Sequence, residues 1–194
     1  MSRFEEAVHF VVSITKPEEL GRTKLAKALF FADLEAYRRT GKPITGAIYE
    51  KRQHGPMPRQ LYEAIDRLDA AGKIAKGHGQ HFGYAQHQFW SREEPELKSL
   101  AGVDVAILAS WTRHICENHT AASISDLSHN AAWHLADFGE HIPFAAYLAA
   151  SGRGEATPDE IAQIEAALGV AACGSIRRGT GRSRSSKRPP SRLP

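Results

Sequence analysis

The sequence predicts a predominantly helical α+β domain with a central buried helix and a small antiparallel β-sheet. The first observation is a helical pattern over residues 23–40 that is apolar on two adjacent sides, typical of a helix that other elements surround. The second is a set of short segments that favour strands, at 44–49, 73–76 and 84–90. At 194 residues, 42% of them hydrophobic, the chain is long enough for one domain followed by a tail.

The predicted central helix carries one acid, Asp33, between its two apolar lines. Burying that charge without a partner would cost several kcal/mol, so we expect hydrogen-bond donors around it. Thr45, Tyr49 and the backbone amides around Gly46 follow the helix directly and are the expected donors. The helix residues expected to face water are Lys24, Lys27, Glu35 and Arg38.

The other elements of the first half are predicted from caps and turn residues. Ser2 has capping-box spacing to Glu5 and opens a helix from Phe4 to about Thr15. The strand at 44–49 follows the helix-ending segment 41–43, since the residue before a proline leaves the α region. Further along are a rigid turn at 55–58, an amphipathic helix at 58–71 and a hairpin whose strands, 73–76 and 84–90, are joined by residues 77–83.

The second half is predicted to be helical. Apolar residues recur at helical spacing between Val103 and Ile115, and the segment Ser123–Asp126 resembles another capping box. Further helical segments are expected at 142–148 and at 157–169, where Thr157 and Pro158 open an amphipathic helix.

Charge and composition divide the chain into a domain at 1–174 and a disordered Arg-rich tail at 175–194. The net charge is +3, but the tail holds seven basic residues and no acid, so the remainder carries −4. Such a tail can contact nucleic acid weakly through counterion release. The basic residues are Arg177, Arg178, Arg182, Arg184, Lys187, Arg188 and Arg192.

The setting predicted for the chain is the cytoplasm. The apolar run after Glu5 and Glu6 is too short for a secretion signal or a membrane span. Cys116 and Cys173 lie far apart in the sequence, which fits reduced thiols.

Catalytic and metal chemistry find little support in the residue pattern. Nucleophile-elbow, P-loop and dinucleotide-binding motifs are missing from the sequence, so we predict no catalytic residue and no cofactor. Two histidine groups lack the companions at ligand spacing that a metal site needs, and we predict no metal. They are His78, His81 and His87 in the hairpin, and His114 and His119 with Cys116 on one helix. A hydrolase remains an alternative if Asp33 and His129 meet in an open cleft.

A DNA-binding regulator of winged-helix type is a second alternative, because the order of helices and hairpin fits one. The helix at 58–71 would then read DNA. Its exposed face, however, is net negative, which would repel phosphates. Arg59 and Arg67 are outnumbered there by Glu63, Asp66 and Asp69.

A series of short motifs resembles the Panacea domain, the antitoxin domain of SocA-like proteins from bacteria and their phages. The resemblance spans residues from about 4 to 150. It is carried by Lys24-Leu25, Leu29-Phe30-Phe31-Ala32-Asp33, Gly41-Lys42-Pro43-Ile44-Thr45-Gly46 with Tyr49, Gly55-Pro56 with Leu61, and Leu127-Ser128-His129 with Trp133. The chain departs from the family pattern at Phe30-Phe31, where a leucine-tyrosine type pair is expected, and at Ala131-Ala132, where a proline is common.

The resemblance implies an antitoxin that is not an enzyme and that neutralises a co-encoded toxin by binding it. In some members the domain delivers the toxin to a protease. By position, the motif residues implied for partner binding are Asp33, Thr45, Gly46, Tyr49, Gly55, Pro56, His129 and Trp133. Each also has a structural interpretation, in which the glycines and prolines shape turns, Trp133 packs in the core and His129 caps or bridges a helix.

Overall fold

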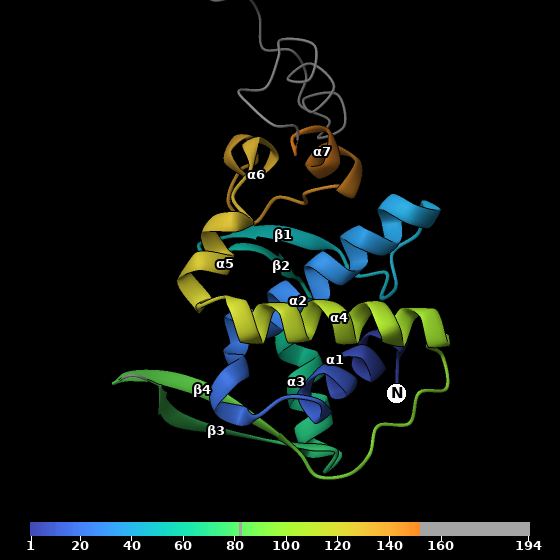
Figure 1. Cartoon of the computed structure of the whole chain (residues 1–194), viewed down its shortest axis with the longest axis vertical. Helices are drawn as coiled ribbons and strands as arrows, with labels where there is room; N and C mark the ends of the chain where they lie inside the picture. The colour runs from blue at the N-terminus through green and yellow to red at the C-terminus, as the bar shows by residue number, and fades with distance from the viewer. Residues whose placement is uncertain (82, 152–194) are drawn as a thin grey trace, which may run out of the picture.

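A computed structural model describes residues 1–81 and 83–151, and it confirms the predicted helical α+β class (Figure 1). Helices surround a long central one, and two β-hairpins lie on opposite sides of it. The predicted helix at 157–169, the boundary at 174 and the Arg-rich tail lie outside the described residues. The elements in chain order are α1 (Arg3–Ser13), α2 (Pro17–Thr40), β1 (Tyr49–Arg52), β2 (Gly55–Pro58), α3 (Leu61–Ala70), β3 (Ile74–His81), β4 (Tyr84–Ser91), α4 (Gly102–Asn118), α5 (Ala121–Leu127), α6 (Ala131–Leu135) and α7 (Phe144–Ala149).

The central element is α2, which packs against α1, α4, α5, α7 and strands of both hairpins. Its backbone leaves helical geometry at Gly21, with φ 58° and ψ 165°, so the long straight part begins just after that glycine, as the sequence predicts. A side chain at this position would collide with Gln86 of β4, since a Cβ would lie 2.6 Å from the nearest atom of its side-chain amide group. Gly21 therefore allows both the bend and the close approach of the hairpin.

The two helices predicted at 4–15 and 58–71 are present as α1 and α3, but α1 ends at Ser13 and α3 begins only at Leu61, because Pro58 lies in β2. Ser2 caps α1 with the expected capping box to Glu5. Helix α3 buries one apolar stripe, and Gly72 follows it with a φ of 71°, the left-handed conformation of a C′ residue. The buried residues of α3 are Leu61, Ala64, Ile65 and Leu68.

Two predictions about the first hairpin, a strand at 44–49 and a rigid turn at 55–58, are wrong. Residues 44–48 form no strand, because the Thr45 N–H donates to Asp33 and Gly46 has a φ of 68°, and β1 begins only at Tyr49. Residues 55–58, predicted as a rigid turn, form β2 and pair with β1 in the register Tyr49↔Pro58 to Arg52↔Gly55. Prolines are tolerated in β2 because a two-stranded sheet has edges that need no ladder donor.

The second hairpin is longer than predicted and does not join the first in one sheet. Strand β3 runs to His81, so most of the expected connection at 77–83 is strand. Gly77 and Gly79 suggested a loop, but here they leave room for neighbouring side chains. A Cβ would lie 2.9 Å from the Trp90 ring at Gly77 and would overlap the Gln88 amide at Gly79.

From Gly102 to Ser151, where the described part of the chain ends, the elements are helices as predicted, with shifted boundaries. In α4 the buried residues are Leu108, Thr112 and Ile115, whereas Val103 is 62% exposed. Helix α5 is capped by Thr120 rather than by Ser123, because the Thr120 side chain accepts from the Ser123 backbone.

Candidate functional site

The buried carboxylate of Asp33 forms the first part of the site. Its Oδ1 accepts from the Thr45 backbone N–H at 2.7 Å, and its Oδ2 accepts from the Tyr49 hydroxyl at 2.8 Å and from the Thr45 hydroxyl. Asp33 is 0% exposed. The structure therefore confirms the donors expected from the sequence, and we call Asp33, Thr45 and Tyr49 the Asp33 centre.

Burial dominates the electrostatics of the Asp33 centre. It raises the pKa of the Asp33 carboxyl, while the hydrogen bonds from Thr45 and Tyr49 oppose the rise. Burial and the adjacent Asp33 also raise the pKa of the Tyr49 hydroxyl well above its usual value. The Tyr49 ring packs edge-on to Phe30, with centroids 5.1 Å apart, so the centre is sealed by the aromatic core.

An enclosed carboxylate is unsuited to the hydrolase alternative. That alternative needs Asp33 beside His129 in an open cleft, but Asp33 is fully buried and bonded to Thr45 and Tyr49. The His129 ring stacks on Trp133 instead, and the charged groups that perturb its pKa do not include Asp33. This arrangement of acid and imidazole is therefore not formed.

The second part of the site is a buried lysine, Lys27, for which the predicted exposure to water is wrong. Lys27 is 1% exposed, and its Nζ donates to the Pro56 carbonyl of β2 at 2.8 Å. Burial lowers the pKa of Lys27 to about 7. No acid forms an ion pair with it in the described ranges. Lys24 is also buried rather than solvated, with 8% exposure.

A signal for the buried lysine is present in the sequence. Phe30 and Phe31 lie three and four residues after Lys27, so they share its side of the helix, and both are buried. The acceptor, Pro56, is 29 residues away, and periodicity within one helix does not identify it.

Gly55 lies in close contact with the side chains of Lys27 and Ser128. Its φ is 91°, and a Cβ there would overlap Ser128 Oγ and lie 2.5 Å from Lys27 Nζ. Gly46 also has a positive φ, of 68°, but no atom lies within 4 Å of a Cβ there. The two motif positions therefore need glycine for different reasons. At Gly46 the positive φ alone favours glycine, whereas at Gly55 both the positive φ and the close packing favour it. We call Lys27, Gly55, Pro56 and Ser128 the Lys27 centre.

His129 and Trp133 lie beside the Lys27 centre. Their rings stack with centroids 3.8 Å apart and planes at 16°. Burial lowers the pKa of His129, and the nearby Lys27 lowers it further. Trp133 is half-buried at the edge of the core, and its Nε1–H donates to the Arg52 carbonyl at 3.3 Å. This tryptophan therefore joins α6 to β1, in addition to the core packing predicted for it.

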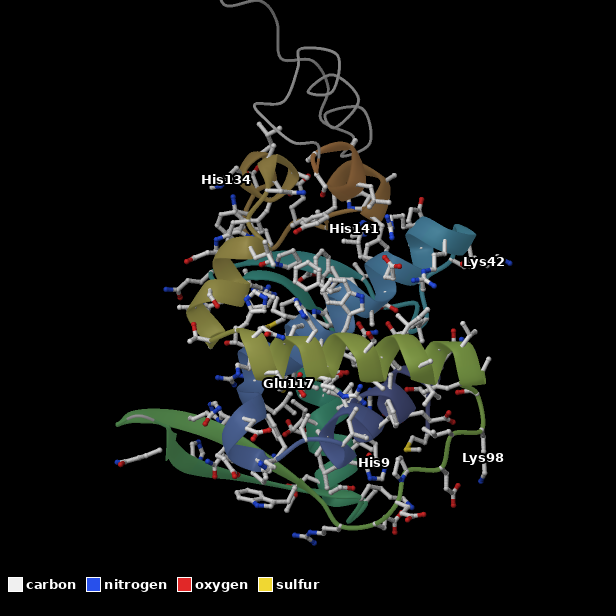
Figure 2. The ribbon with its side chains drawn as sticks, viewed as in Figure 1. His9, Lys42, Lys98, Glu117, His134 and His141 are labelled. Carbon is white, nitrogen blue, oxygen red and sulfur yellow. The ribbon has the colours of Figure 1, made fainter. Side chains whose placement is uncertain are left out.

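An exposed face borders the Trp133 side of the site. The ammonium of Lys51 lies 4.6 Å from the centre of the Trp133 ring, and the Arg52 guanidinium lies 5.5 Å from that of Phe138. Phe138 is 68% exposed and Leu135 46%. We call these five residues the β1–α6 face. His134 of α6 and His141, which lies near α7, are at this end of the molecule (Figure 2).

The histidines of the second hairpin and the lengths of the helices bear on metal ions and membranes. Within residues 1–81 and 83–151, no group of three His, Cys, Asp or Glu side chains is placed to hold a metal ion. The rings of His78 and His87 pair across the second hairpin with centroids 4.6 Å apart. In the same ranges, no helix has the length and apolar composition needed to cross a bilayer.

The charges of α3 do not form a surface for phosphates. Arg67 pairs with Glu5 at 2.7 Å and with Glu63 at 3.6 Å. Arg59 and Arg52 both pair with the buried Glu50, the latter at 2.8 Å. Helices α2 and α3 are also separated by the first hairpin, so they do not form the short helix-turn-helix unit. These observations disfavour the DNA-binding alternative.

The fold and these centres define an α+β protein whose buried polar residues fasten a central helix to a hairpin and lie under an exposed apolar and basic face. The family model described as "Antitoxin SocA-like, Panacea domain" matches residues 25–134, more than half of the chain. The chain belongs to this family of SocA-like Panacea antitoxin domains, which confirms the resemblance inferred from the motifs. Neither the curated proteins nor the solved structures contain a significant match. The matched range runs from α2 to α6 and includes all eight motif residues.

Proposed function

We propose that this chain is an antitoxin that neutralises a cognate toxin by direct protein–protein binding in the cytoplasm, without catalysis. Membership of an antitoxin family supports this role. One observation carries the proposal. The motif carboxylate of Asp33 is fully buried and has a structural role, whereas the apolar side chains of Leu135 and Phe138 are exposed near the motif residue Trp133. Enclosed polar groups specify a fold, and exposed apolar ones bind partners.

The proposed contact surface is the β1–α6 face. Aromatic and arginine side chains contribute most to protein–protein affinity, and this face presents Phe138 under the Arg52 guanidinium. Lys51 is fixed by hydrogen bonds to the His134 and Ala136 carbonyls, at 3.2 and 2.9 Å. The chemistry of the face fits a toxin surface with acidic groups around an apolar pocket.

Co-expression with the product of the neighbouring gene tests the proposal. We expect that product to stop growth alone and growth to return when this chain is present. A harmless neighbour, or a toxin that stays toxic beside this chain, would refute the proposal.

A surface variant tests where the toxin binds. Phe138→Asp is expected to weaken toxin binding at least about tenfold in a purified binding assay, because it places a charge where an apolar contact forms. Val103→Asp is the matched control, since Val103 is an exposed apolar residue of α4. Thermal unfolding of both variants shows whether the fold is kept. Equal binding by wild type and Phe138→Asp would contradict the assignment of this face.

We further propose that the chain acts as an adaptor for degradation of the bound toxin. Toxin half-life is then expected to fall when the chain is co-expressed and to recover in a host that lacks the responsible protease. A neutralised toxin with an unchanged half-life would contradict the adaptor step while leaving inhibition by binding intact.

A further inference from the structure

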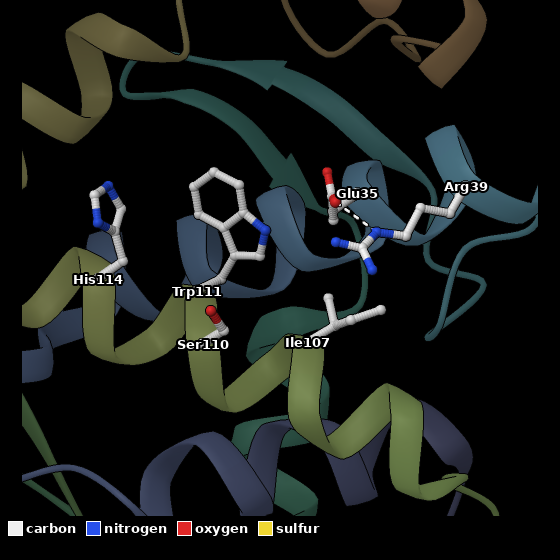
Figure 3. Close-up of a pocket in the computed structure, with 6 residues that line it drawn as sticks. All are labelled: Glu35, Arg39, Ile107, Ser110, Trp111 and His114. Atoms are coloured by element: carbon white, nitrogen blue, oxygen red, sulfur yellow. Dashed lines mark hydrogen bonds and ion pairs between the residues drawn. The ribbon is translucent and has the colours of Figure 1, made fainter.

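A groove between α2, α4, α5 and α7 shares no lining residue with the β1–α6 face. It consists of two adjoining hollows of about 370 and 420 Å³ that share Glu35 and Trp111. Trp111 forms part of the floor, stacked on Phe31 with ring centroids 5.0 Å apart. Figure 3 shows Trp111 and Ile107 rising from α4 on the side that Glu35 and Arg39 of α2 approach. We call this surface the α4–α7 groove, and its apolar residues are Phe31, Leu34, Ile107, Trp111, Leu127, Tyr147 and Leu148.

The rim of the groove is basic. Arg38 and Arg39 both pair with the single carboxylate of Glu35, at 3.0 and 2.6 Å. Their side chains are 64% and 60% exposed, so one acid is shared by two accessible guanidinium groups. The groove therefore suits an occupant with an apolar stripe and acidic neighbours.

The chain itself supplies such an occupant at the point where the described part ends. Ala150 and Ser151 line the groove, so the following residues start at its edge. Five residues separate Ser151 from Thr157, a distance of at most about 20 Å. From Gly154 to Ile176 the sequence contains no Lys or Arg, and its acids are Glu155, Asp159, Glu160 and Glu165.

The sequence of 157–169 provides the apolar stripe as well. Ile161, Ile164 and Leu168 follow at i, i+3 and i+7, which places them on one face of a helix. Thr157 and Pro158 have the positions of an N-cap and a first-turn proline.

We propose that residues 157–169 dock as an amphipathic helix into the α4–α7 groove of their own chain, with Ile161, Ile164 and Leu168 against the apolar floor and the acids near Arg38 and Arg39. This intramolecular contact goes beyond the toxin-binding function and uses a different surface. Any other partner of the groove has to displace the helix first.

Hydrogen exchange of the full-length chain tests the docking. We expect amides of 159–168 to exchange at least about tenfold more slowly than in a free peptide of that sequence. In the double variant Ile161→Asp/Ile164→Asp this protection is lost, and groove peptides from α4 and α7 exchange faster. Gln163→Glu is the matched control, because Gln163 lies off the apolar stripe and should leave the protection unchanged.

A variant of the groove gives an independent readout. Leu127 is 56% exposed, so Leu127→Glu leaves the fold intact while disturbing the groove wall, and it should reduce protection of 159–168. Free-peptide exchange rates in the wild-type segment would overturn the proposal. Protection that disappears on dilution, together with a dimer mass in light scattering, would overturn it in favour of docking between two copies.

Discussion

The buried ammonium of Lys27 leads to a specific prediction about pH. Burial lowers its pKa from 10.5 to about 7, so between those values the unfolded chain holds a proton that the folded chain has released. Unfolding free energy rises with pH wherever the unfolded state binds more protons. Lys27 therefore destabilises the fold fully below about pH 7, and this cost disappears as pH rises toward the pKa of the unfolded chain.

Lys27→Met removes the titrating group and keeps an unbranched side chain. The shift in pKa corresponds to a destabilisation of the wild-type fold by about 5 kcal/mol at low pH, which the variant avoids. The variant leaves the Pro56 carbonyl without its donor, which costs it about 1–3 kcal/mol. We expect the variant to be more stable than wild type by about 2–4 kcal/mol near pH 6 and less stable by about 1–2 kcal/mol near pH 10. The difference should change by up to about 1.4 kcal/mol per pH unit between these limits.

Urea unfolding of both proteins at a series of pH values measures this difference. Lys42→Met is the control, because Lys42 is exposed and points away from the body of the protein (Figure 2). A difference between Lys27→Met and wild type that stays constant with pH would show that Lys27 does not lose its proton in this range, and the reasoning from burial would fail.

Two further pairs of substitutions, at Asp33 and Tyr49 and at Gly55 and Gly46, have expected outcomes in the same assay. Asp33→Ala should lower the free energy of unfolding by at least about 3 kcal/mol, since three donors lose their acceptor, whereas Tyr49→Phe removes one hydrogen bond and should cost about 1 kcal/mol. Equal losses from the two substitutions would contradict the hydrogen-bond assignment. Gly55→Ala should cost at least about 3 kcal/mol, because steric overlap adds to backbone strain, and Gly46→Ala only about 1 kcal/mol of strain. If Gly46→Ala proved the more damaging, the contact of Gly55 with Lys27 would not be the cause.

The sequence predicts the Asp33 centre because the cost of burying a charge requires donors. The nearest hydroxyl groups after the helix are those of Thr45 and Tyr49, and both donate to Asp33. The same interaction explains why a strand at 44–49 was wrongly predicted. The Thr45 N–H that a neighbouring strand would need is bound to Asp33 instead.

The Lys27 centre was not predicted because its stabilising contacts join distant parts of the chain. Periodicity treats a lysine as a solvent-facing residue, but its long apolar stem can be buried with the ammonium at a carbonyl. Gly55-Pro56 predicts a turn from local chemistry, yet the turn lies at Gln53 and His54, and Pro56 lies in β2.

A chain of contacts joins the two buried centres to the β1–α6 face, although the residues that make these contacts lie far apart in the sequence. Asp33 is hydrogen-bonded to Tyr49 at the start of β1, and Lys27 is hydrogen-bonded to Pro56 of β2. Helix α2 is therefore bonded to both strands of the first hairpin. The hairpin then positions α6, because the Arg52 carbonyl of β1 accepts from Trp133. The exposed Phe138 lies next in this chain of contacts, under the Arg52 guanidinium. We therefore expect a disturbance at either buried centre to reach the β1–α6 face through the hairpin, although neither Asp33 nor Lys27 is exposed enough to touch a partner.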